Sequence, residues 1–272
     1  MTRDSGGQGI LFAAAGSSCP EAQATFDRIG RQAAVRFPGI GVRWAFTSSG
    51  VRRKLDQQGR HRADPSEALS TMQAEGFSSV AVTSLHLSDG MEYGELSATV
   101  DSFRNGKGSL TKVTLGPALM ADENIWRRVV SSVLEALSAR QGHEAVILVA
   151  HGSLDPRAVA TLAGAIAVCR QVDPALFLGM ILGSPSQKDI LEECRVAGVR
   201  KVWLVPCLVA VGLSVQDVIM GIGEESWKSC FERAGITCVP VFKGLGDYDG
   251  IVDVWMNQSR RLLEVLLKPL SE

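Results

Sequence analysis

The chain has 272 residues, of which 46% are hydrophobic and 21% are charged, and its formal net charge is -1. This charge provides no basic surface for nucleic acid or an anionic membrane, and no apolar run approaches the roughly 20 residues of a membrane span. The length and composition are those of a globular protein with room for two modest domains.

The N-terminal segment contains an apolar run, residues 10–15, that ends in Gly16-Ser17-Ser18-Cys19. A lipoprotein signal needs a longer apolar core after a cationic segment, where this chain has Asp4. We therefore interpret the run as a first strand that enters a turn, and we expect the protein to stay in the cytoplasm. The six cysteines agree with that expectation, because none has C-x-x-C spacing and scattered cysteines favour reduced, mostly buried thiols.

The rest of the first half predicts alternating strands and helices. Strands are expected at residues 42–47, 79–87 and 113–119. Helices are expected at residues 20–37, 49–58, 65–76, 92–103 and 123–139. The second of these helices carries Arg52, Arg53 and Lys54, which we interpret as solvent-exposed charges, with contacts to substrate carboxylates as the alternative.

The second half repeats this layout after a boundary at residues 141–143. An apolar run at 146–150 precedes a helix that begins at Pro156, and further strands (176–182, 200–209) and helices (186–197, 249–267) follow. The sequence therefore predicts an α/β fold of two similar Rossmann-like lobes with parallel sheets, at residues 8–141 and 142–272. Packing of the last helix against the first lobe is left open, and a ligand is expected in the cleft between the lobes.

The first chemical candidate is His151, which follows the apolar run 146–150 directly. Ligands bind beyond the carboxyl ends of parallel strands, which is where His151 is expected. Gly152 would let a ligand come close to the backbone, and Ser153 offers a hydroxyl. The alternative is that His151 only completes the strand end through an ordinary hydrogen bond.

The second candidate is the pair His86 and Glu92, six residues apart across a glycine turn at the end of a predicted strand. An imidazole and a carboxylate suit proton removal or metal delivery near neutral pH. The alternative is that Glu92 only stabilises the N-terminus of the next helix. Other chemistries are poorly supported, because the chain lacks a phosphate loop, a G-x-G-x-x-G site, a G-x-S-x-G elbow and a dense set of zinc ligands.

Three segments together resemble a known family: LHLSDGMEY, VAHGS and LVAVGLSVQDVIMGIGEESWKSCFERAGI. They are similar to the anaerobic-type cobalt chelatases of cobalamin synthesis, in the class II chelatase superfamily. The resemblance implies a two-lobed enzyme that inserts Co²⁺ into sirohydrochlorin without an organic cofactor, with Fe²⁺ or Ni²⁺ as alternative metals. It implies that His151 binds the metal and accepts a pyrrole proton. From its pairing with His86, we expect Glu92 to be catalytic as well. The expected substrate contacts are Ser17, His86, Tyr93, Ser153, Leu182 and Leu213.

Two of the three metal-ligand positions depart from the family pattern. Leu182 stands where the family has a metal-binding glutamate, and Leu213 where it has a second metal-binding histidine. One interpretation is an active chelatase in which the four macrocycle nitrogens hold the metal. The alternative is a non-catalytic tetrapyrrole binder or carrier, and a more distant one is a two-lobed binder of another small molecule. A homo-oligomer is left open.

Overall fold

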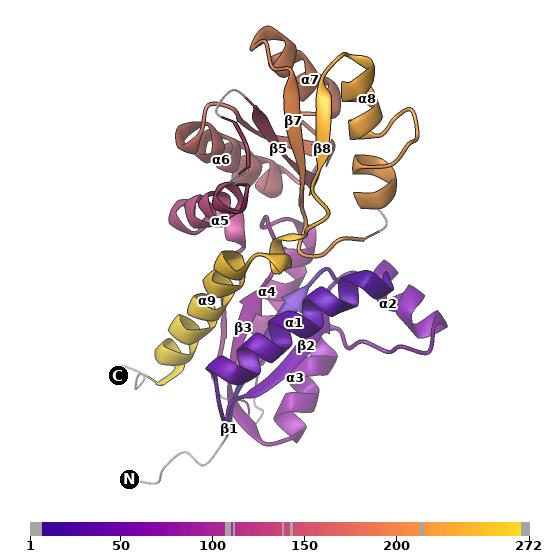
Figure 1. Cartoon of the computed structure of the whole chain (residues 1–272). Helices are drawn as coiled ribbons and strands as arrows, with labels where there is room; N and C mark the ends of the chain where they lie inside the picture. The colour runs from indigo at the N-terminus through magenta and orange to yellow at the C-terminus, as the bar shows by residue number, and fades with distance from the viewer. Residues whose placement is uncertain are drawn as a thin grey trace. The chain divides into compact units, whose positions relative to one another are not determined.

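The computed structural model describes residues 7–106, 110, 112–137, 139–141, 144–212 and 215–267. These residues form two compact units (Figure 1). The first unit contains the described residues of Met1–Ser18, Asp27–Leu119 and Asp253–Glu272. The second unit contains those of Cys19–Phe26 and Met120–Val252. The lobe boundaries expected from the sequence stay a prediction.

The first unit is built on a parallel sheet with the strand order β2-β1-β3-β4. Its strands are β1 (Gly7–Ala14), β2 (Gly41–Phe46), β3 (Phe77–Ser84) and β4 (Lys112–Leu115). Its helices are α1 (Pro20–Arg36, from Asp27 on), α2 (Ser49–Gln57), α3 (Pro65–Ala74), α4 (Met91–Arg104) and α9 (Asp249–Leu267, from Asp253 on). Because all four strands run the same way, the loops that follow them lie at one edge of the sheet.

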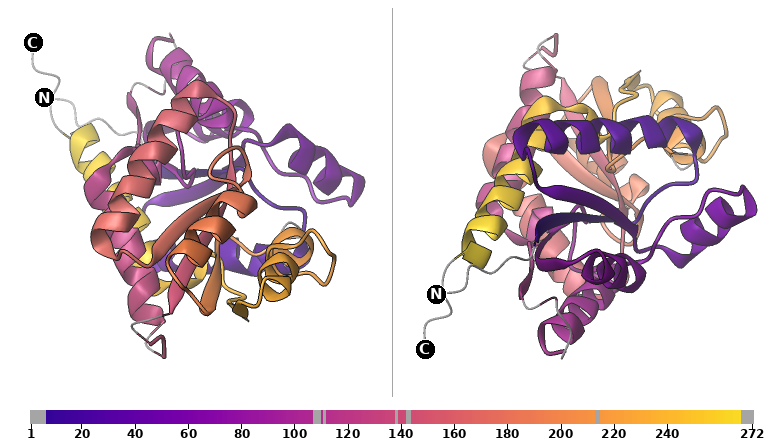
Figure 2. Two further views of the ribbon diagram at one scale, coloured as in Figure 1. Left: turned by 90° about the horizontal axis from the view of Figure 1, so that it is seen from above. Right: turned by 90° about the horizontal axis from the view of Figure 1, so that it is seen from below.

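Helices cover both faces of this sheet (Figure 2). On one face, Leu69 of α3 and Leu96 of α4 join Leu11 and Val82 in a buried apolar cluster. On the other face, the Ser259 hydroxyl of α9 lies 2.7 Å from that of Thr83 in β3. Both faces of the central strands are therefore covered, and residues 10–14 of β1 and 80–84 of β3 are buried.

The second unit repeats the plan with the parallel strand order β6-β5-β7-β8. Its strands are β5 (Ala145–Gly152), β6 (Leu176–Leu182), β7 (Lys201–Cys207) and β8 (Thr237–Pro240). Its α-helices are α5 (Glu123–Ala136), α6 (Pro156–Val172), α7 (Gln187–Val196) and α8 (Trp227–Arg233), and a π-helical segment spans Val215–Ile219. The parallel α/β fold expected from the sequence is confirmed.

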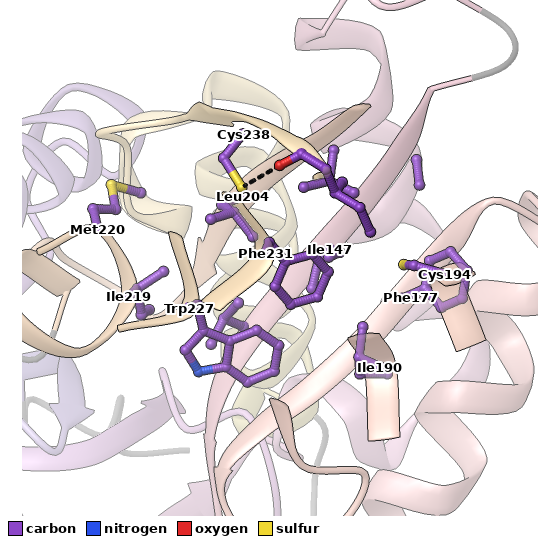
Figure 3. Close-up of a cluster of buried hydrophobic side chains, with 14 residues drawn as sticks. Ile147, Phe177, Ile190, Cys194, Leu204, Ile219, Met220, Trp227, Phe231 and Cys238 are labelled. Atoms are coloured by element: carbon purple, nitrogen blue, oxygen red, sulfur yellow. Dashed lines mark hydrogen bonds between the residues drawn. The ribbon is translucent and has the colours of Figure 1, made fainter. Parts of the chain in front are cut away.

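An aromatic cluster anchors α8 to the sheet of the second unit (Figure 3). The rings of Trp227 and Phe231 are stacked with centroids 6.2 Å apart, and both side chains are buried together with Ile147 and Leu204. Burial of large side chains such as these contributes roughly 1.5–3 kcal/mol each. This packing holds the segment that follows β7 against the sheet.

Several local expectations needed correction. The strand expected at 113–119 ends at Leu115, because Gly116-Pro117 leads into a 3₁₀ turn at Leu119–Ala121. Strand β5 continues through His151 and Gly152, so His151 lies on the strand and not on the loop after it.

All six cysteines are free thiols, five of them buried, as expected. Within the described part of the chain, no helix is both long and apolar enough to cross a membrane.

Candidate functional site

In the first unit, the candidate side chains meet at the carboxyl edge of the sheet. His86 follows β3, and its side chain is only 7% exposed. Its backbone is held on both sides, because its N–H donates to Ser84 Oγ at 3.2 Å and its carbonyl accepts from the Leu119 N–H at 3.0 Å. The imidazole is therefore placed by the sheet and by the chain that follows β4.

Both ring nitrogens of His86 have hydrogen-bond partners. Nδ1 lies 2.9 Å from Ser84 Oγ, and Nε2 lies 2.9 Å from Thr47 Oγ1, just beyond the end of β2. The Thr47 hydroxyl also donates to Glu92 Oε2 at 3.1 Å, and this carboxylate oxygen is 3.8 Å from His86 Nε2. The structure thus brings His86 and Glu92 together, as the sequence predicted, through a threonine that the sequence analysis did not single out.

Burial controls the charge of His86. Removal of the imidazole from water lowers its pKa from 6.5 to about 4, since the charged form loses its hydration. The ring of Tyr93 meets it edge-on at 6.2 Å between centroids, and the Tyr93 hydroxyl donates to the Gly116 carbonyl at 3.2 Å. Burial, with a smaller effect of Asp89, also raises the pKa of Tyr93. Because its pKa lies near 4, His86 is neutral at physiological pH.

The buried neutral His86 predicts a pH dependence of stability. The unfolded chain protonates this imidazole near pH 6.5 and the folded protein near pH 4, so its contribution is fully present above pH 6.5 and is lost as the pH falls toward 4. We expect His86 alone to lower the free energy of unfolding by roughly 2 kcal/mol between pH 7 and pH 5. Urea unfolding of the wild type and of His86→Gln at both pH values measures this loss.

The control for this experiment is His61, an exposed imidazole that contacts Glu67 at 2.9 Å and Asp56 at 3.1 Å. Hydrogen bonds to these carboxylates raise the pKa of His61, so its contribution has the opposite sign. His61→Gln should therefore leave the acid loss in place, while His86→Gln should reduce it. An equal loss in the wild type and in His86→Gln would contradict the prediction.

In the second unit, His151 lies near the end of β5 with its side chain exposed. The next residue, Gly152, has a φ of +78° and pairs with Leu182 of β6. A Cβ atom on Gly152 would lie 2.0 Å from the Leu182 carbonyl oxygen, so only glycine fits between these strands. The Leu182 side chain is 43% exposed. The strand pair thus places an imidazole and an apolar side chain at the same edge.

The remaining predicted residues lie on turns. Ser153 accepts a hydrogen bond from the Asp155 N–H at 3.0 Å, and Asp155 in turn caps α6. Ser17 is half-buried in the turn after β1. Leu213, expected to contact substrate, falls outside the described residues. Among the residues that the structure does describe, no three His, Cys, Asp or Glu side chains are grouped so that they could hold a metal ion.

Thr47 and Arg52 are the functional candidates that the sequence analysis missed or misread. Arg52 was expected as a solvent-exposed charge, but its Nη1 donates to the carbonyls of Phe46 at 2.5 Å and Thr47 at 2.7 Å. The Arg52 guanidinium is thus held over the end of β2 by its hydrogen bonds to two backbone carbonyls. The signal available in the sequence was a threonine just after a predicted strand, the position where ligands bind in such sheets.

Comparison with known proteins gives consistent results along the whole chain. The family model described as cobalt chelatase (CbiK) matches residues 8–264. The chain is 38% identical to the sirohydrochlorin cobaltochelatase CbiKC of Nitratidesulfovibrio vulgaris strain Hildenborough over 251 residues, or 92% of this chain and 88% of that protein. It is 29% identical to the sirohydrochlorin cobaltochelatase of Salmonella typhimurium strain LT2, over 81% of this chain and 83% of that protein.

Solved structures show the same fold. The sirohydrochlorin chelatase SirB from Bacillus subtilis subspecies spizizenii in complex with cobalt superposes with a TM-score of 0.65 at 16% identity, over 95% of this chain and 96% of that chain. CbiX, the terminal enzyme of siroheme biosynthesis in denitrifying bacteria, gives 0.57 at 15% identity, over 96% and 100%. At these identities the likeness establishes the fold alone.

Proposed function

Because the chain belongs to the cobalt chelatase (CbiK) family, we propose that it inserts Co²⁺ into sirohydrochlorin. The observation that carries this proposal is the 38% identity, over 92% of the chain, to a protein named as a sirohydrochlorin cobaltochelatase. The non-catalytic carrier considered above finds no support in the comparisons, since the two relatives described above are named as cobaltochelatases. Cobalt is the metal in both names, and Fe²⁺ and Ni²⁺ are therefore secondary candidates.

The proposed reaction needs a metal ion and two proton acceptors. Two pyrrole N–H protons leave the macrocycle as the divalent ion binds to its four nitrogens. We assign His151 as metal ligand and proton acceptor, because an exposed imidazole can do either near neutral pH. We assign Glu92 as a second acceptor, since its half-buried carboxylate is fixed by the Thr47 hydroxyl.

The other residues are assigned to substrate contact or support. Leu182, exposed beside the β5 edge, suits a flat apolar macrocycle face, and Ser17 and Ser153 offer hydroxyls at turns after two strands. His86 was expected to contact substrate. Both of its nitrogens are occupied, so we assign it an indirect role through Thr47. The cytoplasmic location and a homo-oligomeric state stay predictions.

An absorbance time course tests the function. Purified protein, sirohydrochlorin and Co²⁺ are mixed, with a matched reaction without protein, and the conversion of the free macrocycle to its cobalt complex is followed. Catalysis predicts conversion faster than the protein-free reaction and proportional to protein concentration. A shifted tetrapyrrole spectrum with no gain in rate would instead support the carrier. Parallel reactions with Fe²⁺ and Ni²⁺ rank the metals.

A further inference from the structure

The strongest unassigned feature is a chain of hydrogen bonds that runs from the interior of the first unit to the Glu92 carboxylate. It passes from Ser84 Oγ to His86 Nδ1 (2.9 Å), from His86 Nε2 to Thr47 Oγ1 (2.9 Å), and from Thr47 Oγ1 to Glu92 Oε2 (3.1 Å). Exposure rises along this chain, because Ser84 and Thr47 are buried and the Glu92 side chain is 35% exposed. The chain thus connects three buried groups to one carboxylate that solvent or a ligand can reach.

One assignment of protons satisfies every member of this chain. Ser84 Oγ already accepts from the His86 N–H, so its own proton is available for His86 Nδ1. A neutral imidazole that accepts at Nδ1 carries its proton on Nε2 and donates it to Thr47 Oγ1. The Thr47 proton is then donated to Glu92, whose ionised carboxylate offers only acceptors.

The backbone of Thr47 is held in place independently of this chain. Its N–H donates to the Ala14 carbonyl at 2.8 Å, and its own carbonyl accepts from Arg52 at 2.7 Å. The Thr47 hydroxyl has one other acceptor, the Ala14 carbonyl, at the longer distance of 3.3 Å. The hydroxyl is therefore a fixed point between His86 and Glu92, and the side chain that it can orient is the carboxylate.

We propose that Thr47 is a positioning residue of the chelatase reaction, whose hydroxyl joins buried His86 to Glu92 and holds that carboxylate ready to accept a substrate proton. This inference rests on the proposed function, in which Glu92 is a proton acceptor. His86 is not the base in this arrangement, because both of its nitrogens are hydrogen-bonded and its ring is out of reach of solvent. Its role is to donate a hydrogen bond from Nε2 to Thr47, so that the Thr47 hydroxyl donates to Glu92.

A matched pair of variants separates this role from simple packing. Thr47→Val keeps the branched shape and loses the hydroxyl, whereas Thr47→Ser keeps the hydroxyl and loses the methyl group. We expect Thr47→Val to lower kcat for cobalt insertion by roughly 10- to 100-fold with KM for sirohydrochlorin unchanged, and Thr47→Ser to stay within about threefold of the wild type. If Thr47 acted only by packing, Thr47→Val would stay close to the wild type and Thr47→Ser would lose more activity than Thr47→Val.

A spectroscopic readout tests the link without using activity. The ¹⁵N NMR signals of His86 should report a proton on Nε2 in the wild type and in Thr47→Ser, with a changed Nε2 signal in Thr47→Val. Thr47→Ala removes the same hydroxyl without placing a methyl group against the ring, and it replaces Thr47→Val if that variant does not fold. An unchanged His86 signal in the variant without the hydroxyl would overturn the proposal.

The two proposals fail in different ways. A wild type that does not accelerate cobalt insertion overturns the proposed function and with it the catalytic part of this inference. An active wild type with an equally active Thr47→Val overturns the role of Thr47 alone. A Thr47→Val variant with a higher KM and an unchanged kcat also overturns it, because the hydroxyl would then contribute to substrate binding and not to proton transfer.

Discussion

Replacement of His151 by alanine is expected to lower kcat for cobalt insertion by about 100-fold or more, because it removes the exposed imidazole assigned as metal ligand and proton acceptor. The side chain is exposed, and the backbone around it is fixed by the pairing of β5 with β6. The variant should therefore fold normally and still bind the macrocycle. Single-turnover absorbance measurements separate insertion from binding when the concentration of sirohydrochlorin is above its dissociation constant.

His61→Ala is the matched control, since His61 is also an exposed histidine and its imidazole contacts Asp56 and Glu67 on the surface. It should retain the wild-type rate. Equal rates for the wild type and for His151→Ala would show that the reaction does not use this imidazole. Loss of the tetrapyrrole spectral shift in His151→Ala would show instead that His151 contributes mainly to substrate binding.

The fold was largely predictable because several strands, such as β5 and β6, are short apolar runs that are buried. Strand β6 (Leu176–Leu182) and helix α9 (Asp249–Leu267) have the bounds expected from the sequence. The error at β4 has a local cause, since the apolar residues after Leu115 continue the pattern while Gly116-Pro117 ends the strand. The pattern of apolar residues indicates which residues are buried, and it does not distinguish a strand from the turn that follows it.

The candidate site was only partly predictable. His86 and Glu92 are six residues apart, so a single turn brings them together, and the sequence reveals that pairing. Thr47 lies 39 residues from His86 in the chain and reaches it because β2 and β3 both pair with β1. The identity of a hydrogen-bond partner on another strand depends on the register of the strands and on side-chain direction. Neither can be predicted from the residues adjacent in the sequence.

The exposure of Leu182 has a consequence for metal binding. The register that places Gly152 opposite Leu182 puts an apolar side chain next to the strand that carries His151. Affinity for a divalent ion comes from several converging donors, and one imidazole provides a single donor. The described residues thus favour a reaction in which the four nitrogens of the macrocycle supply most of the ligands for cobalt.

Substitution of Gly152 by alanine is expected to destabilise the protein by roughly 3 kcal/mol or more, through two separate effects. A φ of +78° costs a residue with a Cβ about 1–2 kcal/mol. The new Cβ would also lie 2.0 Å from the Leu182 carbonyl oxygen, a backbone atom, so the edge of the β5–β6 ladder must separate. Because His151 precedes Gly152, cobalt insertion should fall together with the free energy of unfolding.

Gly164→Ala is the matched control for this substitution. Gly164 lies in α6, where a Cβ would meet no atom within 4 Å, so alanine should leave stability unchanged or raise it by about 0.5–1 kcal/mol. Urea unfolding of both variants measures the difference. A Gly152→Ala variant as stable as the wild type would show that β5 and β6 part easily at this edge. In that case the position of His151 would not depend on Gly152, and the Gly152→Ala variant would retain cobalt insertion.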